Sequence, residues 1–248
     1  MKIMVKPKIL LIHGWDYVNY TSSGCIDAWS NRSKFAQALS RHFDVVRINL
    51  PGFCGQSDPG KPWNLDDYVD YVNIFIEKEH PDYILGYSFG GAIVLHWKRR
   101  SRDVRVKTFL VSPAIIRKYE KTDLGFVKKT LKSVLSKELV SLLRDFYLTK
   151  VVKNPYYSKA TKVMRETYRN IVAVDLREDL LQLTDSLTLI YGENDTATPP
   201  NLVQEVLRHS KIQHRIEIIS SGGHNIANSH TEELVSLIVK KREVTDEV

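Results

Sequence analysis

The sequence predicts an α/β fold, with a mostly parallel sheet of about six strands flanked by helices. Short apolar runs alternate along the 248-residue chain with segments of helical periodicity. Parallel strands covered on both faces are continuous apolar runs, and strand–helix alternation is typical of such sheets. One long interval lacks any strand pattern, which indicates a helical insertion between two strands.

The expected elements follow one another in order. The expected strands are 8–12, 43–50, 82–85, 106–111, 187–191 and 215–219. The expected helices are 33–42, 65–79, 90–100, 201–208 and 232–241. Residues 1–114 and 186–248 are therefore predicted to form one core domain.

The interval 115–185 is predicted to be a helical cap inserted in this core. Apolar positions in 124–146 and again in 163–172 recur with the spacing of a helix face. The Asn154-Pro155 step separates the two sets, because proline ends or bends a helix and restricts the residue before it.

The sharpest motif is Gly86-Tyr87-Ser88-Phe89-Gly90, at the end of the 82–85 strand and the start of the next helix. A serine on such a tight strand-to-helix turn needs neighbours without bulky side chains, which the glycines supply. Glycine and serine also crowd ordinary loops, but this context favours Ser88 as a catalytic nucleophile.

A serine nucleophile needs a general base within hydrogen-bond reach. The last strand, 215–219, runs into Ser-Ser-Gly-Gly and then His224, which would bring an imidazole to the carboxyl edge of the sheet. The other seven histidines lie mainly on or beside expected helices, where exposed or capping positions are the simpler interpretation. His224 is therefore the candidate base.

A carboxylate between them in the chain would orient the imidazole. Asp195 lies in the turn after the 187–191 strand, and Glu193 is a rival in the same turn. Aspartate also favours turns for their own sake. The order Ser…Asp…His favours Asp195 as the catalytic acid.

The developing oxyanion would need two hydrogen-bond donors. The backbone N–H of Phe89 follows the nucleophile directly, and the N–H of Trp15 lies in the loop after the first strand. His13 and Tyr87, next to these positions, are candidates for the substrate pocket.

Five segments in order resemble the α/β-hydrolase superfamily, in its branch of small capped esterases and lipases: LLIHGWD, INLPGFCGQSD, ILGYSFGG, LTLIYGENDTATPP and SGGHN. The resemblance implies the roles given above for Ser88, Asp195 and His224, oxyanion donors at Trp15 and Phe89, and a cap at 115–185. It implies a serine hydrolase that cleaves a carboxylic ester or similar acyl bond of a small molecule through an acyl-enzyme, with no cofactor and no metal.

Two alternatives stay open at this point. A hydrolase that cleaves a C–C bond of a diketone-type substrate uses the same three residues, and a non-catalytic binding protein can keep the fold. Dehalogenases and epoxide hydrolases are disfavoured, because their relatives carry aspartate where Ser88 stands.

Charge is concentrated in the expected cap. The chain has a net charge of +7, and 115–185 holds 15 Lys and Arg against 9 Asp and Glu. This excess is either a solvated face or a surface that attracts an anionic substrate or an acyl carrier. No nucleic-acid-binding motif is present, so nucleic acid is not an expected partner.

Location is predicted from absences in the sequence. No apolar window reaches 18 residues, and 9–12 is too short for the core of a signal peptide, so no membrane span and a cytoplasmic location are expected. Cys25 and Cys54 are expected to be free thiols, since two cysteines form no disulfide framework or metal cluster.

Overall fold

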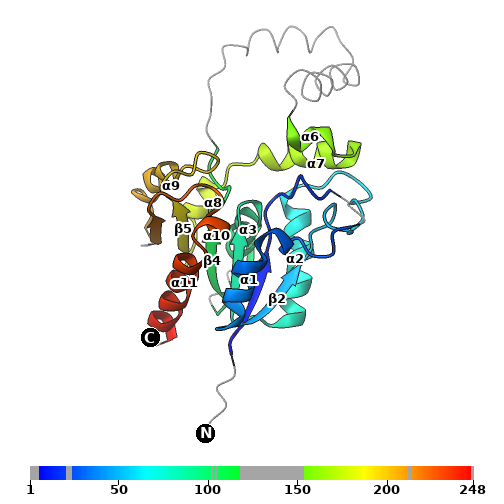
Figure 1. Cartoon of the computed structure of the whole chain (residues 1–248). Helices are drawn as coiled ribbons and strands as arrows, with labels where there is room; N and C mark the ends of the chain where they lie inside the picture. Colours follow the sequence, from blue (N-terminus) through cyan, green and yellow to red (C-terminus); the bar gives the residue numbers. More distant parts are fainter. Residues whose placement is uncertain are drawn as a thin grey trace.

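A computed structural model describes residues 6–20, 24–101, 103, 105–117, 154–211 and 214–246 of the chain. Side chains are described up to residue 240. Within these ranges a central sheet is covered by helices on both faces (Figure 1).

The sheet has six strands, all parallel, in the order β2-β1-β3-β4-β5-β6. Their bounds are β1 Lys8–Ile12, β2 Asp44–Ile48, β3 Tyr83–Tyr87, β4 Lys107–Val111, β5 Thr188–Gly192 and β6 Arg215–Ile219. Every strand runs the same way, so all six carboxyl ends lie at one edge of the sheet. The predicted fold class is confirmed.

Helices form one layer on each face. One apolar cluster joins the sheet to α2 (Leu65–Glu79), α3 (Phe89–Ser101) and α9 (Pro200–Leu207). The other joins it to α1 (Ser33–Ser40), α10 (Ile226–Ser229) and α11 (Thr231–Asp246), and a short 3₁₀ helix, Ser30–Arg32, precedes α1. Among the described helices none is long and apolar enough to cross a membrane.

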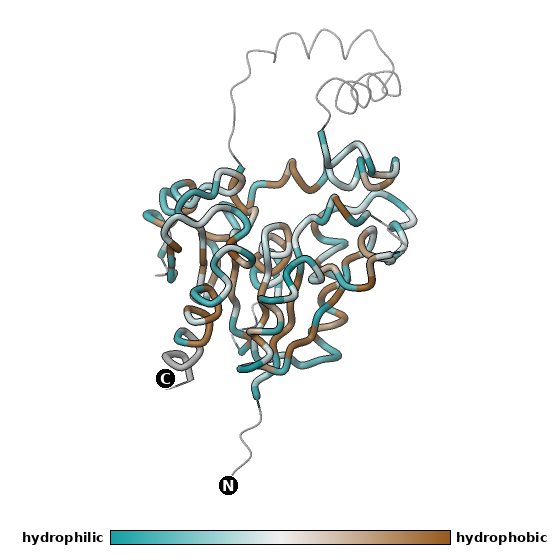
Figure 2. Tube along the Cα trace, viewed as in Figure 1, coloured by the Kyte–Doolittle hydropathy of each residue, from teal (hydrophilic) through white to brown (hydrophobic). Residues whose placement is uncertain are grey.

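The central strands are apolar because both their faces are covered. All five residues of β3 and of β5 are buried. Figure 2 shows apolar residues running along the strands and polar residues on the outer helix surfaces. This burial supplies the main driving force for folding.

Local signals fix the ends of α2. Asn64 and Asp67 form a capping box, in which each side chain accepts a hydrogen bond from the backbone N–H of the other residue. His80 ends the helix with a left-handed backbone (φ 47°). The expected range 65–79 is therefore reproduced.

Three described helices lie between β4 and β5: α6 (Pro155–Ser158), α7 (Lys162–Val172) and α8 (Arg177–Leu181). Figure 1 shows α6 and α7 beyond the carboxyl edge of the sheet. The helix expected at 163–172 is observed as α7, with Met164 and Ile171 of its apolar face buried and Val172 exposed, and the face expected at 124–146 lies outside the described residues. The insertion is thus at least partly helical, while its boundaries at 115 and 185 stay predictions.

The insertion packs closely on the core. Met164 of α7 is fully buried, and a Cβ placed on Gly52 would lie only 2.4 Å from the Met164 sulfur. Gly52, at φ 89°, thus leaves room for a helix that covers the loop after β2. At the other end, Leu180 of α8 is buried in the same apolar cluster as α3.

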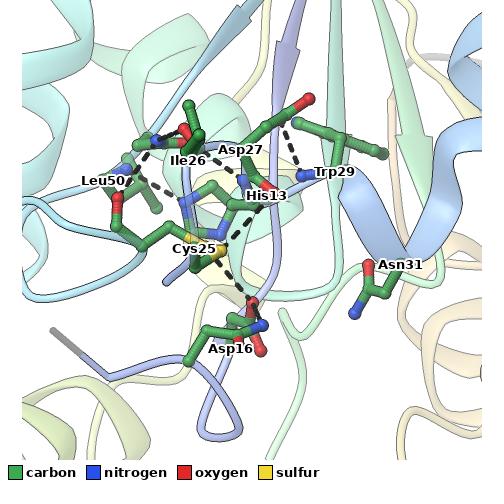
Figure 3. The surroundings of a disulfide bond; sticks show 12 residues. His13, Asp16, Cys25, Ile26, Asp27, Trp29, Asn31 and Leu50 are labelled. Atoms are coloured by element: carbon green, nitrogen blue, oxygen red, sulfur yellow. Dashed lines mark hydrogen bonds between the residues drawn. A yellow bond between two sulfur atoms is a disulfide. The ribbon is translucent and has the colours of Figure 1, made fainter. Parts of the chain in front are cut away.

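The two cysteines correct a prediction from the sequence. Cys25 and Cys54 form a disulfide with a Cα–Cα distance of 4.6 Å, so the expectation of free thiols was wrong. Composition gave no hint of the pair, because only the fold brings the loops after β1 and β2 together. The bond lies beside His13 and Asp16, close to the loop that follows β1 (Figure 3).

Candidate active site

The three candidate catalytic residues meet at the carboxyl edge of the sheet. Ser88 directly follows β3, Asp195 follows β5 and His224 follows β6. Because the strands are parallel, residues 136 positions apart in the chain come into hydrogen-bond contact.

Ser88 occupies a strained turn between β3 and α3. Its backbone is left-handed (φ 52°), a conformation that costs a non-glycine residue free energy and often marks a functional site. A Cβ on Gly86 would lie 2.5 Å from the Gly90 carbonyl oxygen, and one on Gly90 would lie 2.2 Å from the Ile12 oxygen. Only glycine allows the turn to close this tightly and α3 to approach β1.

His224 bridges the serine and the aspartate. Its Nε2 lies 3.1 Å from Ser88 Oγ, and its Nδ1 lies 2.9 Å from Asp195 Oδ2. In the tautomer that fits both contacts, Nδ1–H donates to the carboxylate and Nε2 accepts from the serine hydroxyl. The imidazole is part-buried, whereas the side chain of Asp195 is fully buried.

Asp195 is held as a carboxylate by its neighbours. Burial raises the pKa of Asp195, but hydrogen bonds from His224 and from the backbone and hydroxyl of Thr198 outweigh burial and bring the pKa below its ordinary value. The rival, Glu193, is exposed and accepts hydrogen bonds from Ser220 and Ser221 instead. The geometry thus brings together Ser88, His224 and Asp195, with Glu193 outside.

Thr198 is a neighbour that the sequence did not single out. Its hydroxyl donates to Asp195 Oδ2 at 2.8 Å and lies 3.3 Å from His224 Nδ1. The backbone N–H groups of Ala197 and Thr198 both donate to Asp195 Oδ1. The available signal was the spacing Asp-x-x-Thr before a proline, which is typical of side-chain-capped turns.

Phe89 is the first residue of α3, and the N–H groups in the first turn of a helix lack intrahelical acceptors. Among the described residues, neither the Trp15 nor the Phe89 N–H has a hydrogen-bond partner. The Trp15 ring packs on the Phe89 ring with centroids 5.3 Å apart. The two residues expected to supply the oxyanion N–H donors are therefore neighbours in space.

His13 and Tyr87 have partners within the protein. His13 is 1% exposed, its Nδ1 contacts the Gly14 oxygen, and its Nε2 accepts from the Leu50 N–H. Burial lowers the pKa of His13 to about 4, so this ring is neutral. The Tyr87 hydroxyl donates to the His224 carbonyl oxygen. Both side chains hold loops around the site.

An aromatic layer lies over the Trp15 loop. The Trp15 indole donates to the Tyr20 hydroxyl, which donates in turn to the Tyr156 carbonyl oxygen of α6. Tyr168 of α7 packs on the Trp15 ring at 5.3 Å. These residues are scattered in the sequence, so no local pattern could have grouped them.

No metal site accompanies this arrangement in the part of the chain that the structure describes. That part contains no group of three or more His, Cys, Asp or Glu side chains that could hold a metal ion. The candidate site consists of side chains and backbone groups of the protein.

A parallel sheet with a strained serine turn and a His–Asp pair at its carboxyl edge defines an α/β-hydrolase fold. The chain belongs to the Alpha/beta hydrolase family, whose sequence pattern matches residues 9–237. Solved structures agree on the fold. An esterase from Exiguobacterium antarcticum has a TM-score of 0.67 at 16% identity and covers 96% of this chain and 92% of its own. A meta-cleavage product hydrolase from Pseudomonas fluorescens IP01 has a TM-score of 0.66 at 18% identity, with coverage of 97% and 92%.

Curated proteins of similar sequence are named as esterases. A pimeloyl-[acyl-carrier protein] methyl ester esterase from Neisseria meningitidis serogroup C is 23% identical over 251 residues, covering 93% of this chain and 91% of that protein. Its counterpart from Pseudoalteromonas atlantica is 25% identical over 252 residues, with 92% of each chain covered.

Proposed function

We propose that this protein is a serine hydrolase that cleaves carboxylic esters, with Ser88 as nucleophile, His224 as general base and Asp195 as the orienting acid. The observation that carries the proposal is the chain of contacts from Ser88 Oγ through both nitrogens of His224 to Asp195. The names of the esterase relatives support ester bonds as the target.

The proposed reaction begins with proton transfer from Ser88 to His224 Nε2. Ser88 Oγ bonds to the carbonyl carbon, and the carbonyl π electrons move onto its oxygen. When the tetrahedral intermediate collapses, the C–O bond to the alcohol breaks, and His224 gives its proton to the departing alkoxide. Water then attacks the acyl-enzyme with His224 again as base, which releases the carboxylic acid and restores Ser88. Asp195 stabilises the imidazolium in both halves.

The proposed oxyanion donors are the backbone N–H groups of Trp15 and Phe89. Their position at the start of α3 and in the adjoining loop supports this role, because the positive end of a helix favours developing negative charge. For His13 and Tyr87, expected from the sequence as pocket residues, we propose a supporting role, because the His13 ring accepts from the Leu50 N–H and the Tyr87 hydroxyl donates to the His224 carbonyl oxygen.

For the substrate, we propose an ester of an acyl chain that is carried by an acyl carrier. The relatives named above act on a pimeloyl-[acyl-carrier protein] methyl ester. The cationic excess of 115–185, 15 Lys and Arg against 9 Asp and Glu, would attract an acidic carrier. If rates for carrier-bound and free neutral methyl esters fall equally as salt rises, this attraction does not operate.

The cytoplasmic location expected from the sequence stays a prediction. The disulfide between Cys25 and Cys54 weighs against it, since disulfides persist mainly in oxidising compartments. Thiol alkylation of protein trapped directly from its native cells, followed by mass spectrometry, decides whether the bond is present there.

The decisive experiment pairs an active-site phosphonate with a substrate panel. Stoichiometric labelling of Ser88 is expected, and its absence would favour a non-catalytic binding protein. In the panel, methyl and p-nitrophenyl esters of increasing acyl length are compared with a ring-cleavage diketone. Turnover of the diketone alone would replace ester hydrolysis with C–C bond cleavage.

A further inference from the structure

We propose that Thr198 is a positioning residue of this active site. Its hydroxyl holds the Asp195 carboxylate and the His224 imidazole in the orientation that catalysis needs. The inference rests on the proposed function, in which that pair activates Ser88. It assigns to Thr198 a role that neither the motif nor the family resemblance gave it.

The hydroxyl lies where three groups meet. Thr198 Oγ1 is 2.8 Å from Asp195 Oδ2, 3.2 Å from the Ser112 carbonyl oxygen and 3.3 Å from His224 Nδ1. It carries a single proton, and the shortest contact identifies Asp195 as the main acceptor. The Ser112 carbonyl oxygen is a second acceptor, available when the hydroxyl turns away from the carboxylate.

These contacts restrain rotation of the carboxylate. Asp195 Oδ1 accepts two backbone N–H groups, from Ala197 and Thr198, and lies 3.1 Å from His224 Nδ1, while Oδ2 is shared between His224, at 2.9 Å, and the Thr198 hydroxyl. Without the hydroxyl, Oδ2 would keep the imidazole as its one polar partner among the described residues. The planar carboxylate could then turn, and Nδ1 would be held less firmly opposite Ser88.

Ser112, whose carbonyl oxygen is the second acceptor, connects the turn after β5, which carries Asp195 and is called the acid loop below, with the nucleophile Ser88. Ser112 directly follows β4 and has a left-handed backbone (φ 44°). The residue before it, Val111, accepts the Ser88 N–H, and Ala114 donates its N–H to the Ser88 carbonyl oxygen. The end of β4 therefore holds the backbone of the nucleophile on both sides and meets the acid loop at Thr198. This short segment therefore contacts both Ser88 and the turn that carries Asp195.

The test compares Thr198→Val, which keeps the shape and removes the hydroxyl, with Thr198→Ser, which restores it. The matched control is Thr108→Val, because Thr108 lies within β4, is 5% exposed and has a hydroxyl with no partner among the described residues. Circular dichroism melts establish that each variant is folded, and Thr198→Ala replaces the valine variant if that one is not.

In Thr198→Val, we expect kcat on a p-nitrophenyl ester to fall about tenfold or more, as for a lost hydrogen bond to a charged group, while KM changes less than about twofold. Thr198→Ser and Thr108→Val should both stay close to the wild-type values. A role in packing alone would leave Thr198→Val, which keeps the shape, close to wild type and would impair Thr198→Ser, which lacks the methyl group, and that outcome overturns the inference.

A readout that needs no turnover separates this inference from the proposed function. The proton on His224 Nδ1 is followed by ¹H NMR, where we expect faster exchange with water in Thr198→Val than in wild type, Thr198→Ser or Thr108→Val. Unchanged exchange in the valine variant overturns the positioning role even if the enzyme is an esterase. If wild-type protein neither hydrolyses esters nor reacts with the phosphonate, the proposed function is wrong. The NMR comparison still decides the role of Thr198 in that case.

Discussion

The Nε2 atom of His224 lies 3.1 Å from the hydroxyl oxygen of Ser88, although the two residues belong to loops that follow different strands. Ser88 is held by backbone hydrogen bonds to the end of β4 and the residues after it, and the carbonyl oxygen of His224 accepts a hydrogen bond from Tyr87, the residue directly before Ser88. The contact is therefore built into the fold before any substrate arrives, and the following predictions start from it.

Removing the nucleophile should abolish hydrolysis. Ser88→Ala keeps a Cβ in the left-handed turn, so we expect a folded protein with kcat reduced by about 10⁴-fold or more. Initial rates on the most reactive p-nitrophenyl ester measure the effect. Ser40→Ala, at the exposed end of α1, is the control and should match wild type. Retention of full activity by Ser88→Ala would end the proposed mechanism.

The two acidic residues of the turn after β5, Asp195 and Glu193, should differ sharply in their effect on activity. Asp195→Asn keeps the shape but removes the acceptor of the Nδ1 proton, and should lower kcat by about 10³- to 10⁴-fold. Glu193→Gln is the matched control, since within the described part of the chain the Glu193 carboxylate accepts hydrogen bonds from the exposed Ser220 and Ser221 and lies outside the Ser88–His224–Asp195 contacts, and its activity should stay within about twofold of wild type. Equal losses in both variants would contradict the assignment of Asp195.

The disulfide should stabilise the protein. It joins residues 29 positions apart, and closing a loop of that size stabilises the folded state by about 3 to 4 kcal/mol in the chain-entropy description. The double variant Cys25→Ser/Cys54→Ser should lose that free energy of unfolding in urea titrations. Reductant should destabilise wild type to the same degree and leave the double variant unchanged. A reductant effect of the same size on both proteins would mean that another group responds.

His96 should make stability depend on pH. Its hydrogen bond to Asp179 of α8, with a further bond to Asp66 of α2, raises the pKa of His96 above its ordinary value of about 6.5, against the lowering effect of burial. A raised pKa means that the stabilisation is fully present below the unfolded value and is lost as pH rises through the folded value. Arg100 pairs with the same Asp66 and with Asp70, so these charges also face the His96 cluster.

Urea titrations of wild type and His96→Gln from pH 5.5 to pH 9 measure this contribution. The free energy of unfolding of wild type should exceed that of the variant most at the acid end, and the difference should shrink toward pH 9. A difference that is constant over this range would show that the ion pairs of His96 do not depend on its protonation, and the prediction would be wrong.

The sequence determined most of the fold through patterns that are local. The apolar run at 8–12 is β1 to the residue, and α2 occupies 65–79, because continuous burial and a capping box leave direct marks in the chain. The order of Ser88, Asp195 and His224, each just beyond a strand, was also enough to predict that they meet, since parallel strands deliver their ends to one edge.

What only the tertiary structure decided are contacts between segments that carry no shared pattern. The pairing of Cys25 with Cys54 and the place of the Thr198 hydroxyl between Asp195 and His224 depend on how loops of different strands are held against each other. The hydrogen bond from the Leu50 N–H to the buried His13 ring likewise joins two loops that share no sequence pattern. Periodicity records which face of an element is buried, whereas a hydrogen bond between loops depends on ångström-scale distances that only the packed sheet sets.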